Sequence, residues 1–281
     1  MNTILTLAKL TFREATRRRI VTAGVLMGIA FLVIYDLGFH FMQQDLVRPG
    51  YSRLPSETVQ AQAYNMMLMA GLYVVNFLVI VLAALITSDS LAGEIQSGTI
   101  QAIVTKPIRR SGVVLGKWLG NAGLLLLYVT LMSGGVILSL FVMAGYHTPN
   151  WLAGMALIYF NSLIIMTVAL ALSSTLSTIA TGGVVLGLFG LAFIGGWVER
   201  IGTFLNNQTA SNLGIISSLL MPSDAIWNKA ANQMTSPLIN FTGVSPFSSS
   251  SEPSTVMMIY AVLYLLAAMA IAIRQFGQRD L

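Results

Sequence analysis

The stretch Gly112-Val-Val-Leu-Gly116-Lys117-Trp118 resembles a phosphate-binding loop. Such a loop reads Gly-x-x-x-x-Gly-Lys-Ser/Thr, because its backbone amides and lysine cradle the phosphates while the hydroxyl binds Mg²⁺. The stretch has one residue too few between its glycines and no hydroxyl after the lysine. It therefore predicts close helix packing and a lysine at a membrane interface. We therefore expect this chain to bind no nucleotide or other cofactor itself.

Metal and acid–base chemistry have little support in the sequence. His40 and His147 are the two histidines, and cysteine is absent. Two isolated imidazoles do not make a metal site. No paired carboxylates lie within the apolar stretches, and no nucleophile stands beside a base. We therefore predict no catalytic residue, no metal site and no enzymatic activity in this chain.

A few polar side chains interrupt the apolar stretches. Asp36 lies where an ionisable group is costly, which indicates a transport pathway or a partner; snorkelling to the nearby outer surface is the alternative. Four amides could either make interhelical hydrogen bonds or line a pathway. They are Asn65, Asn76, Asn121 and Asn161.

Composition indicates the elements that must hold these groups. Of the 281 residues, 56% are apolar and 9% are charged, and the mean hydropathy is +0.77. A typical soluble domain has about 25% charged residues. Composition thus excludes an ordinary soluble enzyme, a disordered chain and a nucleic-acid-binding domain. We predict an all-α polytopic membrane protein with a single transmembrane domain over residues 1–281.

Six apolar stretches are long enough to cross a membrane, because a spanning helix needs about 20 residues. Residues 118–198 contain no Asp, Glu, Lys or Arg. Turn-forming residues at 146–150 and 173–183 divide this part of the chain. The predicted spans are 20–39, 64–87, 113–144, 151–173, 180–198 and 255–273.

Three glycine pairs at four-residue spacing occur within the predicted spans. They are Gly24/Gly28, Gly116/Gly120 and Gly183/Gly187. Small residues at this spacing let helix backbones approach closely in a membrane. Each pair therefore predicts a close helix contact.

Basic residues orient the predicted spans. With the N-terminus in the cytoplasm, 11 of the 15 Lys and Arg residues fall on the cytoplasmic side, which is the positive-inside pattern. We predict a multi-pass protein of the plasma (inner) membrane with both termini inside. Residues 1–19 predict an interfacial amphipathic helix on the lipid bilayer, because Lys9, Arg13 and Arg17 share one face opposite an apolar one.

Residues 88–112, between the second and third spans, combine carboxylates, a bend and an apolar stripe. Ser88 and Ser90 are suitable helix N-caps. Glu94 could accept hydrogen bonds from the amides after a Ser-Gly bend, and Pro107 ends the following helix. A short cytoplasmic coupling helix is predicted here to dock a partner, through Asp89, Glu94, Gly98, Thr99, Ile100, Ile103 and Val104.

Residues 199–254 form the predicted extracellular region between the fifth and sixth spans. The apolar run at 213–221 is too short to cross the membrane, and Ser223 can cap another short helix. We predict short extracellular helices here, followed by a disordered loop at 245–254, which is rich in serine and proline.

Several motifs follow one another along the chain. They are Thr11-Phe12-Arg13-Glu14 with Arg17-Arg18-Arg19, Glu94-x-x-x-Gly98-Thr99, Lys106-Pro107, Arg109-Arg110, Gly116-Lys117, Met221-Pro222-Ser223-Asp224 and Arg279-Asp280-Leu281. In this order and placement they resemble the ABC-2 type permeases, which are membrane subunits of ABC transporters, in the branch that includes the NosY-like permeases. The resemblance covers essentially the whole chain.

The resemblance implies the permease subunit of an ATP-driven exporter. Two permeases, as a homodimer or a heterodimer with a relative, would form the substrate pathway. Each would dock one cytosolic ABC ATPase through residues 89–105, so the complex would hold two ATPase copies. The resemblance also implies that the short helices within 199–254 lie near an outer gate. The alternative is a secondary transporter or channel without an ATPase, although the intramembrane charges and inverted repeats typical of that class are scarce.

Overall fold

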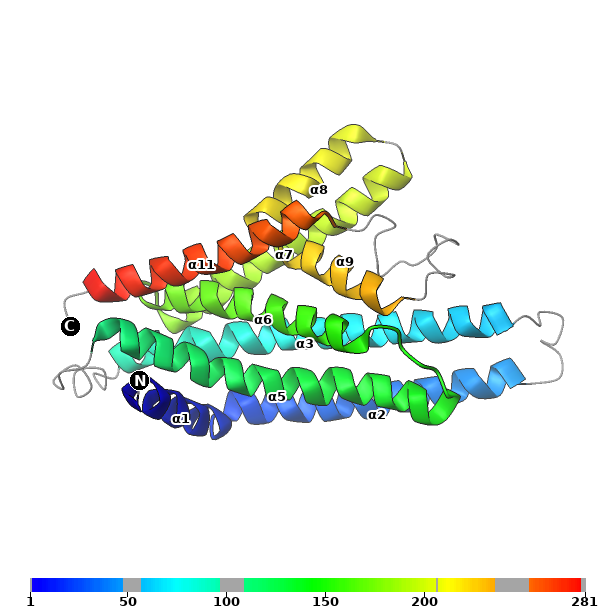
Figure 1. The fold of residues 1–281 in the computed structure, drawn as a ribbon, viewed down its shortest axis with the longest axis horizontal. Coiled ribbons are helices and arrows are strands. Elements are labelled where there is room, and N and C mark those ends of the chain that lie inside the picture. Colours follow the sequence, from blue (N-terminus) through cyan, green and yellow to red (C-terminus); the bar gives the residue numbers. More distant parts are fainter. Residues whose placement is uncertain (1, 48–56, 97–108, 206, 236–252, 279–281) are drawn as a thin grey trace.

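The computed structural model describes residues 2–47, 57–96, 109–205, 207–235 and 253–278. Within these ranges the elements are helices, and six of them are long and apolar enough to span a membrane (Figure 1). The predicted all-α class with six spans is thus confirmed. The six are α2 (Arg19–Val47), α3 (Glu57–Gln96), α5 (Arg110–Ala144), α6 (Trp151–Ser173), α7 (Thr178–Phe204) and α11 (Thr255–Gln278), and the shorter helices are α1 (Asn2–Thr16), α8 (Gln208–Leu220) and α9 (Ser223–Met234).

Several helices extend beyond the predicted spans, because apolarity marks the part of a helix in the hydrocarbon layer rather than its ends. The 40 residues of α3 make a rod about 60 Å long, twice the roughly 30 Å of a bilayer core. Ser88 and Ser90 therefore lie inside α3, and their predicted roles as N-caps are wrong. Ser88 Oγ instead donates to the carbonyl of Ala84 at 2.7 Å. In the same way, α7 continues to Phe204 and carries Glu199 on its last turns.

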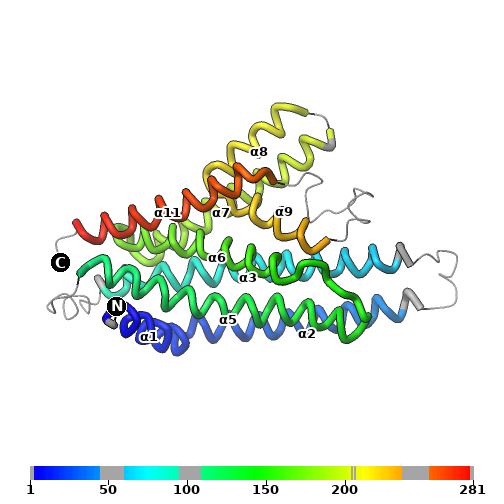
Figure 2. The backbone as a smooth tube through the Cα atoms, in the orientation of Figure 1, coloured from blue at the N-terminus to red at the C-terminus, as the bar shows by residue number. Residues whose placement is uncertain are grey.

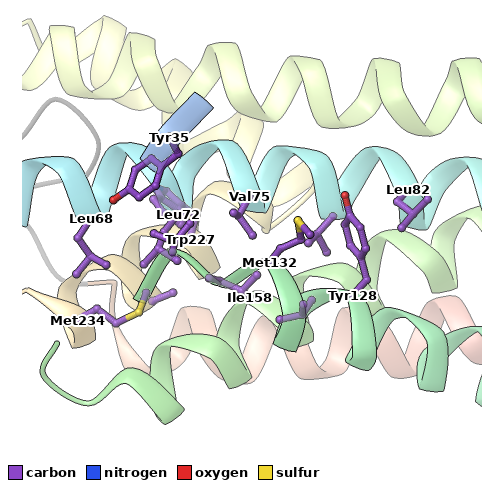
Figure 3. Packing of buried hydrophobic residues seen from close by; sticks show 14 of the residues in the cluster. Tyr35, Leu68, Leu72, Val75, Leu82, Tyr128, Met132, Ile158, Trp227 and Met234 are labelled. Carbon is purple, nitrogen blue, oxygen red and sulfur yellow. The ribbon is translucent and has the colours of Figure 1, made fainter. Parts of the chain in front are cut away.

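Helix α3 is the centre of the bundle and packs against α2, α5, α6 and α7. Figures 1 and 2 show α2, α3, α5 and α6 running along the long axis, while α7 and α8 diverge from them as a hairpin. The main core joins five helices through Tyr35, Leu72, Met132, Ile158 and Trp227, all of them buried (Figure 3). Since Trp227 belongs to α9, that short helix is part of the core and not a surface loop.

Helix α1 packs along the first third of α5, where glycines leave room for it. A methyl group on Gly116 would lie 2.6 Å from Cβ of Leu7. One on Gly120 would lie 2.7 Å from both the carbonyl oxygen of Ala8 and Cβ of Thr11. The close contact predicted for this glycine pair is thus an α1–α5 contact.

The predicted N-terminal helix is present, and α5 covers part of its apolar side, while Leu5 is 58% exposed. Ala15 and Thr11 are buried, whereas Lys9, Arg13 and Arg17 are exposed as expected for a polar face. The part of the apolar side that contacts α5 is a helix-packing surface, and the interfacial position of the helix stays a prediction. Contact of the basic side chains with anionic lipid stays a prediction.

Replacing Gly120 with valine is expected to separate α1 from α5, because the new side chain would overlap the backbone of Ala8. Overpacking of this kind costs roughly 1–3 kcal/mol. The purified variant should therefore melt at a lower temperature and lose its N-terminal helix faster to protease. Gly134 is a matched control on α5, since a Cβ there would have no atom within 4 Å. Equal behaviour of Gly120→Val and Gly134→Val would contradict the packing role.

Candidate functional site

One end of the bundle gathers the ends of α1, α3, α5 and α11 (Figure 1). Leu91, Val113 and Phe276 are buried together there. Arg110 Nη1 also donates to the carbonyl oxygen of Gly277 at 3.0 Å. The helix ends that flank residues 97–108, which lie outside the described part of the chain, are therefore held in a packed assembly.

A buried ion pair joins α3 to α5 at this end. Lys117 Nζ lies 2.5 Å from Oε1 of Glu94 and donates to the carbonyl oxygen of Ser90 at 2.7 Å. Lys117 is 4% exposed, so its side chain is buried between helices, while its predicted position at the membrane interface stays a prediction. A buried ammonium is tolerated only with an opposite charge and hydrogen bonds, and α3 supplies both.

Arg18, between α1 and α2, makes a second ionic bridge to α3. Its Nη1 lies 2.7 Å from Oδ2 of Asp89, and its Nη2 lies 2.6 Å from Oε1 of Glu14. Thr178 Oγ1, at the start of α7, donates to the other oxygen of Asp89 at 3.3 Å. Asp89 thus connects α3 both to the α1–α2 junction and to α7. We call Glu14, Arg18, Asp89, Glu94 and Lys117 the end network.

The structure gives two of the predicted docking residues a contact within the chain. Asp89 and Glu94 lie on the last turns of α3 and belong to the end network. The amides expected to donate hydrogen bonds to Glu94 lie outside the described residues. So do the remaining predicted docking residues, which are Gly98, Thr99, Ile100, Ile103 and Val104. Docking of a partner by these residues stays a prediction.

Sequence reasoning missed Arg18, Lys117 and Thr178 as partners of the two carboxylates. A signal was available for the two cations, because carboxylates end one predicted span while Lys117 begins the next and Arg18 precedes the first. No sequence pattern indicated Thr178, because its contact with Asp89 depends on how α7 packs against α3.

The predicted polar positions within the spans are buried between helices of one chain. Asn161 Nδ2 donates to Asn76 Oδ1 at 3.1 Å and so joins α6 to α3. Asn65 and Asn121 are also buried. Asn76 borders a cavity of about 10 Å³, which is room for about one water molecule. The Asn76–Asn161 contact is an interhelical hydrogen bond, which is one of the two roles predicted for these amides. The other role, lining a transport pathway, stays a prediction for all four.

Asp36 lies on α2 next to Tyr35, whose hydroxyl donates to the carbonyl oxygen of Met67 at 3.2 Å. Oδ1 of Asp36 is buried and has no hydrogen-bond partner among the described residues. A carboxylate oxygen in this setting is costly inside a membrane span. Asp36 therefore remains the candidate for a pathway or partner contact on this helix.

A second buried ion pair joins α7 to α9 beside the middle of α3, where Asp224 borders the same small cavity as Asn76. Arg200 Nη2 lies 2.7 Å from Oδ1 of Asp224 and 3.2 Å from Oδ1 of Asn228, and Asn228 Nδ2 donates to Asp224 Oδ2 at 2.8 Å. Burial raises the pKa of the Asp224 carboxyl above its usual value, while Arg200 and Asn228 oppose that change by favouring the ionised form.

The sequence element that contains Asp224 has a packing role. Gly196 allows α9 to approach α7, because a Cβ on that glycine would overlap the carboxylate of Asp224. Pro222 is the residue at the N-cap of α9 and makes no side-chain capping bond. The predicted capping by Ser223 is therefore wrong, since Ser223 is already the first helical residue.

Six helices of the described residues are long and apolar enough to cross a membrane, which indicates a multi-pass membrane protein. The sequence profile of the family described as ABC-2 family transporter protein matches residues 5–281. The chain therefore belongs to the ABC-2 transporter family, as its motifs predicted, and is a permease-type membrane subunit of an ABC transporter. A search among curated proteins found no match.

Proposed function

We propose that this chain is the permease subunit of an ATP-driven exporter and receives force from a separate cytosolic ATPase at the end network. The buried Glu94–Lys117 pair is the observation that carries the proposal. It joins the two long helices that flank residues 97–108, where the sequence predicts the docking helix. ATP and Mg²⁺ are bound by the partner, while this chain binds the cargo and opens and closes its path.

The end network distributes a displacement of this end over several spans. Since Glu94 and Lys117 join α3 to α5, a push on the intervening segment moves both helices together. Asp89 extends the connection to Arg18 before α2 and to Thr178 on α7. Rigid helices and ionic contacts of this kind are the physical links through which coupling travels. Closure of the ATPases would thus tilt α3 and α5 against the rest of the bundle.

The charge distribution supports an orientation with this end in the cytoplasm. Most Lys and Arg residues of the chain belong to the segments at this end, and cytoplasmic segments carry such an excess. We place the protein in the plasma (inner) membrane with both termini inside. Helices α8 and α9 then lie toward the outer side.

Replacement of Ile103 by glutamate is expected to reduce co-purification of the ATPase by about tenfold, since a charge in an apolar docking stripe loses roughly the energy of one buried side chain. Tagged permease would be purified from cells that also produce the ATPase, and the ratio of the two proteins measured. Ile179→Glu is the control, because Ile179 is 88% exposed at the same end on α7. Equal ratios for both variants and the parent would exclude docking through the predicted stripe.

A second permease copy is the proposed partner within the membrane, and α7 supplies the contact. The space beside two of the predicted glycine pairs is occupied by residues of the same chain. Leu82 and Met132 pack against Gly24 and Gly28 of α2, and α1 packs against Gly116 and Gly120 of α5. By contrast, a Cβ on Gly183, Gly187 or Gly190 of α7 would have no atom within 4 Å. A twofold axis beside α7 would bring the same stripe of each copy together.

Cysteine at position 187 is expected to cross-link two copies under mild oxidation in native membranes. The chain has no cysteine of its own, so each cross-link would report the introduced residue. Leu127→Cys is the control, because Leu127 is 60% exposed on α5. A dimer band for Gly187→Cys alone supports the α7 interface. Equal bands, or none with Gly187→Cys, would contradict it.

Asp36 supports a second candidate, a transporter that is driven by an ion gradient without an ATPase. Its buried oxygen has no partner in the described part of the chain, and lone carboxylates within spans are typical of ion pathways. Transport by the purified permease in liposomes without ATPase, abolished in Asp36→Asn, would favour this alternative.

A further inference from the structure

A cavity of about 250 Å³ lies where α7, α8, α9 and the start of α11 meet. Its walls combine two carboxylates with apolar side chains and with the neutral polar residues Ser218, Asn228 and Ser254. Glu199 and Asp224 supply the carboxylates, and Ile215, Leu219 and Met257 are among the apolar residues. Hydroxyls of Tyr260 and Tyr264 on α11 donate to the carbonyl oxygens of Leu219 and Leu220. The cavity is therefore built between helices that are fixed to one another.

Glycines bring both carboxylates to the cavity wall. A Cβ on Gly196 would overlap the carboxylate of Asp224, and one on Gly214 would overlap Cβ of Glu199. These close approaches allow side chains of α7 and α9 to reach a space that larger residues would fill. Glycine at positions 196 and 214 therefore permits the two close helix contacts that border the cavity.

The charges around the cavity do not balance. Asp224 is paired with Arg200 and hydrogen-bonded to Asn228. The half-buried carboxylate of Glu199 has no hydrogen bond or ion pair with another described residue. Two carboxylates against one guanidinium leave one negative charge beside apolar walls. An uncompensated charge in such a setting is costly, and a cation in the cavity would remove the cost.

We propose that this cavity binds the cationic head of an organic ammonium amphiphile, with Glu199 as its counter-ion. The volume of the cavity suits an ammonium group with a few attached carbons, and Ile215, Leu219 and Met257 form an apolar wall for the adjoining chain. A metal ion fits poorly, because the described residues include no group of three or more His, Cys, Asp or Glu side chains, and hard cations need several oxygen ligands. An anion would be repelled by the net negative charge.

The test measures binding of hexyltrimethylammonium to the full-length protein in dodecyl maltoside micelles by titration calorimetry. We expect binding at one site per chain, and Glu199→Gln should weaken it by about tenfold or more, because a close opposite charge is removed without a change of shape. Hexyl sulfate, with the same tail and the opposite charge, should not bind. Glu57→Gln is the control, because it also removes one negative charge but lies at the start of α3, outside the residues that line the cavity. It should leave binding unchanged.

A second variant tests whether binding needs the volume of the cavity as well as its negative charge. Ala225 lines the cavity and is 8% exposed, so Ala225→Leu should fill part of the cavity while both carboxylates remain. It should also abolish binding. Equal affinity of the parent, Glu199→Gln and Ala225→Leu, or equal binding of hexyl sulfate, would overturn the proposal.

The same titration identifies the source of the ammonium group. Phosphatidylethanolamine added to the micelles competes with hexyltrimethylammonium if the natural occupant is a lipid headgroup. If the lipid has no effect while the dependence on Glu199 persists, the occupant is a free amphiphilic amine. The measurement needs no ATPase, so its outcome is independent of the coupling proposal.

Discussion

Replacement of Glu94 by arginine is expected to abolish ATP-dependent transport while the permease remains inserted in the membrane. The variant would place two cations at the buried contact between α3 and α5, where Glu94 now lies 2.5 Å from Lys117. Breaking a buried pair of this kind costs roughly 3–5 kcal/mol, enough to separate the two helices at the end network. The measurements are cargo transport and its associated ATP hydrolysis in liposomes that contain permease and ATPase.

The exchanged pair is the matched control for Glu94→Arg. Glu94→Lys combined with Lys117→Glu restores opposite charges, although the hydrogen bond to the carbonyl of Ser90 is lost. The double variant should therefore recover part of the activity that each single variant loses, with a coupling energy of at least about 1 kcal/mol. Wild-type coupling in Glu94→Arg, or additive losses in the exchanged pair, would show that the contact does not transmit force.

Replacement of Asp224 by alanine is expected to destabilise the packing of α9 against α7 strongly. Arg200, whose side chain is 13% exposed, would be left as a buried cation without its carboxylate. The expected loss is roughly 3–5 kcal/mol. Thermal unfolding of the purified protein, followed by the fluorescence of its tryptophans, measures the change, because Trp197 and Trp227 lie beside this pair on α7 and α9.

Removal of both charges of the Arg200–Asp224 pair should destabilise the protein less than removal of Asp224 alone. Arg200→Met with Asp224→Ala leaves no unpaired buried charge, so this double variant should melt above Asp224→Ala alone. If the double variant melts lower, the main role of Arg200 is the packing of its side chain over Trp197, and the charge pair contributes little.

Sequence alone predicted the helical class and the six spans, because each span is encoded by a continuous apolar run. The breaks between them were also visible, since Gly145 to Asn150 and the Ser-rich turn before Thr178 stop helices by local chemistry. The ends of α3 were not predictable from apolarity. Residues 88–96 are polar enough to leave the membrane, yet the helix continues through them.

The pairing of charges could not be derived from local pattern. Lys117 was predicted at an interface because a lone lysine at the start of an apolar run snorkels by default. Its burial depends on Glu94, which lies on another helix, and on the carbonyl of Ser90. Similarly, the carboxylate of Asp224 gave no sign of Arg200 as its partner, because the end of α7 was predicted before that residue.

The packing of α1 against the glycines of α5 has a consequence for biosynthesis. Helix α1 leaves the ribosome before α5, and Gly116 and Gly120 follow it about a hundred residues later, which is roughly 5–20 s at ordinary rates of translation. During that time its apolar side has no protein surface to cover it. A basic amphipathic helix can bind the surface of a bilayer without a protein partner. We therefore expect α1 to lie on the membrane surface until α5 has been inserted and α1 can pack against it.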